Sequence, residues 1–127
     1  MGNLTKNFGT DTDPNLCCPC CGQFKINTES LERLQELRNI YNHPIGIVEG
    51  GGYRCEAYGG STTSAHFEGR AFDLAVPKKD LYLLIYLATN IGFTGVGVKN
   101  HGGRYQLHID DAEATDKRPR PWVWTYG

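Results

Sequence analysis

Apolar residues recur at helical spacing in two parts of the chain. Within residues 28–41, leucine, isoleucine and tyrosine return every three or four positions among polar residues, which predicts an amphipathic helix with Thr28 as its N-cap. His43-Pro44 ends this helix, because the residue before a proline avoids helical backbone angles. The same spacing predicts a second helix over about residues 79–90, with Gly92 at the position of a C-terminal cap.

Short apolar segments between and after these helices are predicted to form strands. They cover residues 45–49, 71–76, 94–98 and 105–109. Residues 100–103 join the last two as a turn, whereas residues 1–24 and 53–69 lack periodicity and are expected to be irregular. The pattern predicts one small α+β domain over residues 1–127. Its two helices pack on a short, mainly antiparallel sheet, and residues 1–24 form an irregular, cysteine-containing N-terminal segment.

Composition and charge limit the classes of partner. The chain has 127 residues, enough for one modest core, and its 13 basic and 14 acidic residues give a formal charge of −1. A chain so nearly neutral is expected to bind neither nucleic acid nor an anionic membrane. The sequence has no apolar run near the ~20 residues of a membrane helix, and its N-terminus does not resemble a signal peptide. We therefore expect a protein synthesised in the cytoplasm without a signal peptide. We also expect it to be a monomer.

The cysteines are unevenly distributed. Four of the five lie in one short segment, as Cys17, Cys18, Cys20 and Cys21, and the fifth is Cys55. The segment could supply half of a zinc knuckle, but the sequence does not offer the second pair of ligands that such a site needs. Reduced thiols packed under a loop are the expected state in a cytosolic protein. A disulfide to Cys55 is the next alternative, and an independent structural metal is the last.

Three side chains suit a second kind of metal site. His66 and Asp73 are seven residues apart, which fits delivery by a loop and by the strand 71–76 better than by one helix face. His108, in a later strand, could reach the same point. Two histidines and one carboxylate leave a fourth position open, as in catalytic zinc sites. A metal held there polarises a carbonyl and lowers the pKa of water toward ~7.

The string Ser64-x-His66-x-x-Gly69-x-Ala71-x-Asp73 resembles the signature of the M15 zinc peptidases of bacterial cell walls. Supporting segments occur in the family's order, namely Gly52-Tyr53-Arg54, Gly95-Val96-Gly97, Leu107-His108-Ile109-Asp110 and a basic, Trp-containing tail over residues 118–122. The likeness covers roughly residues 16–126, and the cysteine-rich start is similar to a short subgroup typical of phages. The family includes D-alanyl-D-alanine carboxypeptidases, peptidoglycan endopeptidases and phage lysis enzymes. Hedgehog signalling domains share its fold.

The resemblance implies one zinc ion (Zn2+) per chain, bound by His66, Asp73 and His108. It also implies that Arg54 binds a substrate carbonyl or carboxylate and stabilises the oxyanion of the tetrahedral intermediate. Two further residues are candidate substrate contacts. Ser64 either bonds to substrate or shapes its loop, and Gln106 shares a strand face with His108.

The sequence departs from the family at the general base. Many members have Glu or Asp three residues before the second histidine, where this chain has Tyr105, and tyrosine is a poor base at neutral pH. Asp110 is the favoured substitute, because a strand would direct it to the same face as His108. Its alternative role is to orient His108 through a hydrogen bond. His101 and Glu68 are the other candidates.

The resemblance, with the three candidate metal ligands, implies a zinc metallopeptidase that hydrolyses amide bonds in peptidoglycan stem peptides or cross-links. An endopeptidase is favoured over a D,D-carboxypeptidase, because the chain is short for the lid elements that close a terminal-dipeptide pocket. The expected role is that of a phage-type endolysin acting on the cell wall after release or delivery. The alternative is a non-catalytic zinc-binding module of the hedgehog type that binds a peptide or wall ligand.

Overall fold

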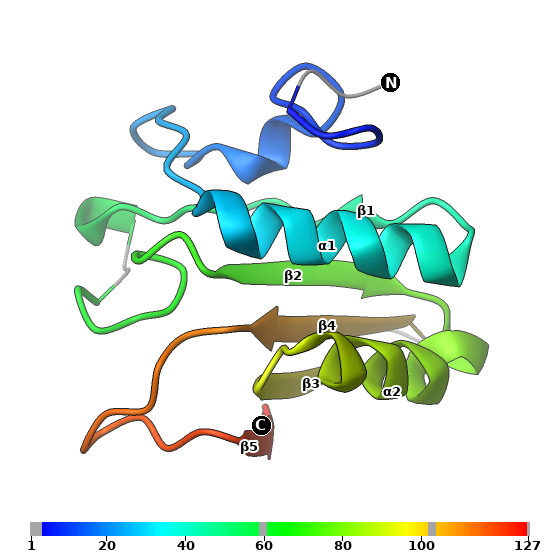
Figure 1. Ribbon diagram of the computed structural model, residues 1–127. Helices are drawn as coiled ribbons and strands as arrows, with labels where there is room; N and C mark the ends of the chain where they lie inside the picture. Colours follow the sequence, from blue (N-terminus) through cyan, green and yellow to red (C-terminus); the bar gives the residue numbers. More distant parts are fainter. Residues whose placement is uncertain (1–3, 59–60, 102–103, 127) are drawn as a thin grey trace.

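The computed structural model describes residues 4–58, 61–101 and 104–126, with only the backbone of His101 (Figure 1). Its centre is a five-stranded sheet of order β1-β2-β4-β3-β5. The strands are β1 (Gly46–Ile47), β2 (Ala71–Val76), β3 (Gly95–His101), β4 (Arg104–Asp110) and β5 (Trp122–Thr125). Neighbouring strands are antiparallel except β3 and β5, which are parallel. The predicted α+β fold with a mainly antiparallel sheet is confirmed.

The helices follow the predicted spacing, with corrections at their starts. α1 spans Thr28–Tyr41, but its N-cap is Asn27 rather than Thr28, because Asn27 Oδ1 accepts the Ser30 N–H at 3.0 Å. α2 spans Leu81–Ile91 and is preceded by a short 3₁₀ turn, Lys78–Asp80. Two further 3₁₀ turns lie at Pro14–Leu16 and Glu56–Tyr58. Gly92 follows α2 as its C-terminal cap, as predicted.

Both helices lie on the same side of the sheet (Figure 1). One face of the sheet is therefore covered by helices, and the other is free of them. Along β4, Leu107 and Ile109 belong to the hydrophobic core. His108 and Asp110 alternate with them and project from the opposite face, because successive side chains of a strand point to opposite sides. Polar groups can therefore gather on the helix-free face without entering the core.

The C-terminal strand was not predicted. The sequence indicated only a basic, Trp-containing tail, but its residues 122–125 pair with β3 as β5. The Trp122 N–H donates to the Thr94 carbonyl at 2.9 Å and starts this pairing. Strand β1 is shorter than the expected 45–49. Among the described residues, no helix is long and apolar enough to cross a membrane.

Candidate metal centre

Strand register places the main site residues in one row across the sheet. Asp73 of β2 lies opposite His108 of β4, which lies opposite Gly97 of β3, which in turn lies beside Trp124 of β5. The row depends on Gly97, because a Cβ atom there would lie 2.5 Å from the Trp124 indole nitrogen. The indole can therefore approach His108, and the two ring centroids are 4.9 Å apart.

His66 reaches the same point from the loop before β2. The Ser64 hydroxyl accepts the His66 backbone N–H at 3.1 Å and shapes the turn. His66 Nδ1 lies 2.8 Å from the Gly52 carbonyl oxygen. A carbonyl only accepts, so Nδ1 donates to it and Nε2 is the ring nitrogen that faces the cluster. The loop then leaves the site at Gly69, whose φ of +73° favours glycine.

Replacing Gly69 with alanine is expected to destabilise the fold by roughly 2–5 kcal/mol, from left-handed strain and overpacking together. Its Cβ would lie 1.9 Å from the Lys25 carbonyl oxygen. Gly22 is a matched control, because it has nearly the same φ, +74°, but nothing within 4 Å of its Cβ position. Gly22→Ala should therefore show the strain alone, about 1–2 kcal/mol. Urea unfolding of both variants, chelated and reduced, measures the difference; equal losses would contradict the steric explanation.

His66, Asp73 and His108 form a buried cluster with converging ligand atoms. Asp73 Oδ1 lies 3.3 Å from His66 Nε2 and 3.0 Å from His108 Nδ1. One such atom from each residue lies within 4.8 Å of the other two. The side chains are 1–8% exposed. This set of two imidazole nitrogens and one carboxylate oxygen fits a zinc ion with an open fourth position.

The charges of the cluster also favour a cation. Burial by itself would raise the pKa of Asp73, but hydrogen bonds from His108 and His66 hold it well below its ordinary value. Burial would lower the pKa of His108, but hydrogen bonds to Asp110 and Asp73 raise it. An imidazole between two carboxylates thus lies in a field that attracts positive charge. A metal ion is a second way of supplying that charge.

Asp110 is engaged on both of its oxygens. Its Oδ2 lies 2.7 Å from His108 Nε2, and Arg120 donates from Nε to Oδ1 at 2.9 Å and from Nη2 to Oδ2 at 2.7 Å. Although burial would raise the pKa of Asp110, His108 and Arg120 lower it to about 2. The His108 Nε2 proton is therefore fixed toward Asp110, which leaves Nδ1 as the ligand atom. Gly95 makes room for this carboxylate, because a Cβ there would lie 2.4 Å from its oxygens.

Arg54 binds the other oxygen of the central carboxylate. Its Nη2 donates to Asp73 Oδ2 at 2.6 Å, and its Nε donates to the Gly50 carbonyl at 2.6 Å. The Arg54 side chain is 30% exposed and lines the cavity above the cluster. The predicted substrate-binding arginine is thus also a partner of Asp73.

The chain matches the model of the family described as Peptidase M15 over residues 6–110. It belongs to the M15 peptidase family. The match begins ten residues before the sequence resemblance and ends at Asp110. No curated protein and no solved structure matches the chain significantly. Family and cluster together indicate a metallopeptidase, with the α+β fold expected of an M15 peptidase.

The remaining candidates of this M15 peptidase lie at different distances from the cluster. Gln106 Nε2 donates to Asp73 Oδ2 at 3.4 Å, so it lies beside the cluster. The Glu68 carboxylate is paired with Arg118 at 2.8 Å. His101 ends β3, four residues beyond Gly97, the strand partner of His108. At ~3.3 Å per residue this is about 13 Å along the strand, so the backbone does not bring His101 to the cluster.

An open cavity of about 300 Å³ lies over the cluster of the M15 peptidase. Four of its lining residues are basic, namely Arg54, Lys117, Arg118 and Arg120, and Asp110 is the acidic one among the described lining residues. Trp124 and Tyr126 form an aromatic side, with ring centroids 6.5 Å apart and nearly parallel planes. Tyr126 is 41% exposed. The aromatic residues 124 and 126 of the C-terminal tail thus line the cavity.

Sequence reasoning did not assign roles to Arg120 or to the two glycines of β3. Arg120 holds Asp110 and lies over the Trp124 ring at 5.4 Å. Gly95 and Gly97 make room for Asp110 and Trp124 respectively. The signals were present as a Gly-x-Gly pair in a predicted strand and a basic residue before alternating aromatics. The roles of these residues could not be inferred from the sequence, because they arise only when β5 pairs with β3.

Proposed function

We propose that this M15 peptidase is a zinc enzyme that hydrolyses amide bonds in the peptide part of peptidoglycan. The observation that carries the proposal is the convergence of His66 Nε2, His108 Nδ1 and Asp73 Oδ1 beneath an open cavity. These residues would hold the zinc ion. When bound, zinc acts as a Lewis acid on a carbonyl oxygen and lowers the pKa of water.

The cavity lining supports a peptide that carries carboxylates. Three of the basic lining residues are paired with carboxylates, Arg54 with Asp73, Arg118 with Glu68 and Arg120 with Asp110. Lys117 adds one further positive charge to the lining, which attracts anionic groups. Stem peptides of peptidoglycan carry free carboxylates along the chain. The aromatic side formed by Trp124 and Tyr126 offers apolar area against which an extended peptide can pack. An open site accommodates a substrate that continues in both directions, which favours endopeptidase action on stem peptides or cross-links over a D,D-carboxypeptidase.

The protein groups are assigned separate tasks in the reaction. Arg54 orients Asp73 through Nη2 and presents its exposed side to the substrate carbonyl, where negative charge develops. Ser64 holds the His66 backbone, and Gln106 holds Asp73. Asp110 keeps the proton of His108 on Nε2. The contacts of Asp110 favour this positioning role over that of general base, because both of its oxygens are engaged and its pKa is about 2.

Replacing Asp110 with asparagine distinguishes the two roles. If Asp110 positions His108, zinc affinity should fall about 10–100-fold, the usual cost of losing an outer partner of a metal ligand. The kcat at saturating zinc should then stay within a few-fold of the wild type. If Asp110 is the base, kcat should fall by about 10²–10⁴ even when zinc is saturating. Zinc titration followed by kinetics on the same samples measures both quantities.

The proposed function is tested by incubating the zinc-loaded chain with defined cross-linked and uncross-linked muropeptides. Mass spectrometry of the products identifies the hydrolysed bond, whether LD, DL or DD. We expect a product that disappears with a chelator and returns with zinc. Intact muropeptides, with zinc bound at the cluster, would contradict the proposal and favour a hedgehog-type module that binds a wall peptide. A phage-type lytic role further predicts that the enzyme lyses cells when supplied to exposed peptidoglycan.

A further inference from the structure

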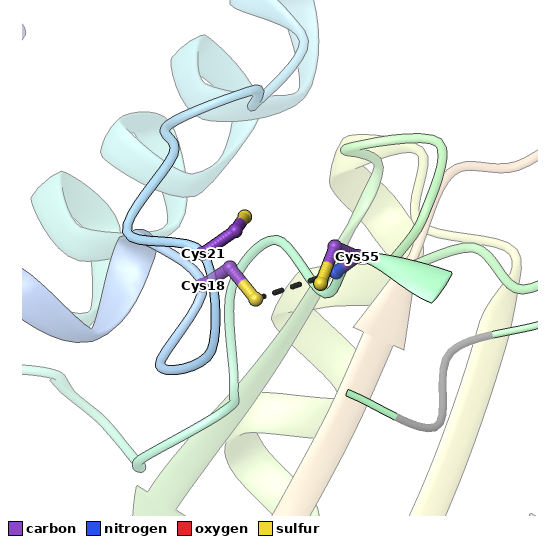
Figure 2. A group of neighbouring side chains, drawn as sticks. All are labelled: Cys18, Cys21 and Cys55. Atoms are coloured by element: carbon purple, nitrogen blue, oxygen red, sulfur yellow. Dashed lines mark hydrogen bonds between the residues drawn. The ribbon is translucent and has the colours of Figure 1, made fainter. Parts of the chain in front are cut away.

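Three cysteine thiols meet at a second point of the molecule, away from the His-Asp-His cluster. Cys18 and Cys21 lie on one turn of the N-terminal segment, and Cys55 lies on the loop opposite (Figure 2). Their sulfur atoms are all within 4.8 Å of one another. Cys18 is buried, Cys55 is half-buried and Cys21 is exposed, and all five cysteines of the chain are free thiols. From the sequence, reduced thiols were favoured, and a disulfide to Cys55 and a structural metal were the alternatives; the convergence of the three thiols bears on the last of these.

The turn that carries Cys18 and Cys21 has the form of a metal knuckle. The Cys18 N–H donates to the Gln23 carbonyl at 2.9 Å, and the Gly22 N–H donates back to the Cys18 carbonyl at 2.8 Å. Gly22 takes a φ of +74°, which closes the turn. These bonds bring the two thiols to the same side. Cys18 and Cys21 have the Cys-x-x-Cys spacing in the sequence, which is typical of structural zinc sites.

Cys55 supplies the ligand that the sequence did not place. The loop that carries it docks on the N-terminal segment, where the Tyr53 N–H donates to the Leu16 carbonyl at 3.1 Å. Gly52 allows this docking, because a Cβ there would lie 2.5 Å from Leu16 Cα. The Cys55 N–H then points at the Cys18 sulfur, at 3.4 Å. Backbone donors of this kind stabilise a thiolate, the form of cysteine that binds metal.

The distances and the number of thiols favour a metal ion over a disulfide. With Zn–S bonds of ~2.3 Å, two thiolates on one tetrahedral zinc lie about 3.8 Å apart. The three sulfurs, all within 4.8 Å of one another, can reach this spacing with small side-chain movements. A disulfide joins only two sulfurs and would leave the third thiol beside it without a role. The fourth position is left to the exposed Cys20 of the same segment or to water.

We propose that Cys18, Cys21 and Cys55 bind a second, structural zinc ion. Its task is to fasten the N-terminal segment to the loop formed by residues 50–55. That loop positions the first site, because the Gly52 carbonyl accepts from His66 and Arg54 holds Asp73. Two zinc ions per chain replace the single ion implied by the sequence resemblance. The inference does not depend on the proposed function, because it concerns a site without substrate.

Cobalt substitution tests the thiolate site without any measure of hydrolysis. The full chain, purified under reducing conditions and stripped with a chelator, is titrated with Co2+ and then, separately, with Zn2+. Thiolate ligands give a strong near-ultraviolet charge-transfer band with cobalt, which imidazole and carboxylate ligands do not. We expect this band in the wild type and in His66→Ala, with two zinc equivalents in the former and one in the latter.

Cysteine variants identify the residues that give rise to the charge-transfer band. Cys55→Ser should lose it and one zinc equivalent, and Cys21→Ser, at an exposed position, should do the same with less risk to folding. Cys17→Ser is the matched control, because Cys17 neighbours Cys18 in the chain but lies outside the group of three thiols. Cys17→Ser should keep both the charge-transfer band and the two zinc equivalents of the wild type. Circular dichroism checks the fold of each variant. A wild type that binds only one zinc equivalent, with none bound by His66→Ala, would overturn the proposal. A Cys18–Cys55 disulfide that persists under the reducing conditions would also overturn it.

Discussion

Replacing Asp73 with asparagine is expected to remove one zinc equivalent from the chain and to abolish hydrolysis. The carboxylate is the central group of the cluster, because its Oδ1 faces both histidines and its Oδ2 accepts from Arg54. Asparagine keeps the shape but removes the negative charge that balances a cation. Zinc affinity should therefore fall by more than ~100-fold, the upper cost of losing an outer partner alone. Competition with a chromophoric chelator measures this loss.

Asp111→Asn is the matched control for this change. Asp111 is a carboxylate of similar burial, 3% exposed against 1% for Asp73, and it also pairs with an arginine, Arg33. It holds β4 to α1 rather than facing the cluster, because its Oδ1 accepts from Ser30 of that helix at 2.7 Å. We expect Asp111→Asn to lose stability but to keep every zinc equivalent. Wild-type zinc affinity in Asp73→Asn would exclude Asp73 from the ligand set.

The elements that were predicted correctly are those in which local pattern and tertiary environment agree. Residues 71–76 form a strand with the predicted bounds, because this apolar segment is paired on both sides, with β1 and with β4. The first helix spans residues 28–41 as predicted, although the cap moved to Asn27. β5 could not be predicted in the same way. It has four residues between a proline and the C-terminus, and it is a strand only because β3 offers a parallel partner.

The residues of the site differ in the same way in how far the sequence predicts them. His66, Asp73 and His108 could be predicted, because a specific motif fixes two of them and strand alternation brings in the third. The Asp110–Arg120 pair could not, because it requires the tail to return beside β3 after leaving β4. Cys55 is a similar case. Its distance from Cys18 in the sequence is 37 residues, and only the docking of Tyr53 on Leu16 brings the two together.

Replacing Arg54 with alanine should have the second largest effect on hydrolysis, and it separates two tasks of this residue. Loss of the bond to Asp73 should weaken zinc binding about 10–100-fold, and excess zinc can compensate by filling the weakened site. Loss of a donor to the developing oxyanion should lower kcat by about 10²–10³, and no amount of zinc restores it. Kinetics across a zinc titration therefore resolve the two.

Arg33→Ala provides the comparison for Arg54→Ala, because Arg33 also pairs with a buried aspartate and is 37% exposed against 30% for Arg54. It lies outside the cavity over the cluster, so its loss should lower stability and leave kcat unchanged. Full recovery of kcat in Arg54→Ala at saturating zinc would reduce its role to holding Asp73. In that case the ion itself would have to stabilise the oxyanion, and the basic residues 117, 118 and 120 would act only in substrate binding.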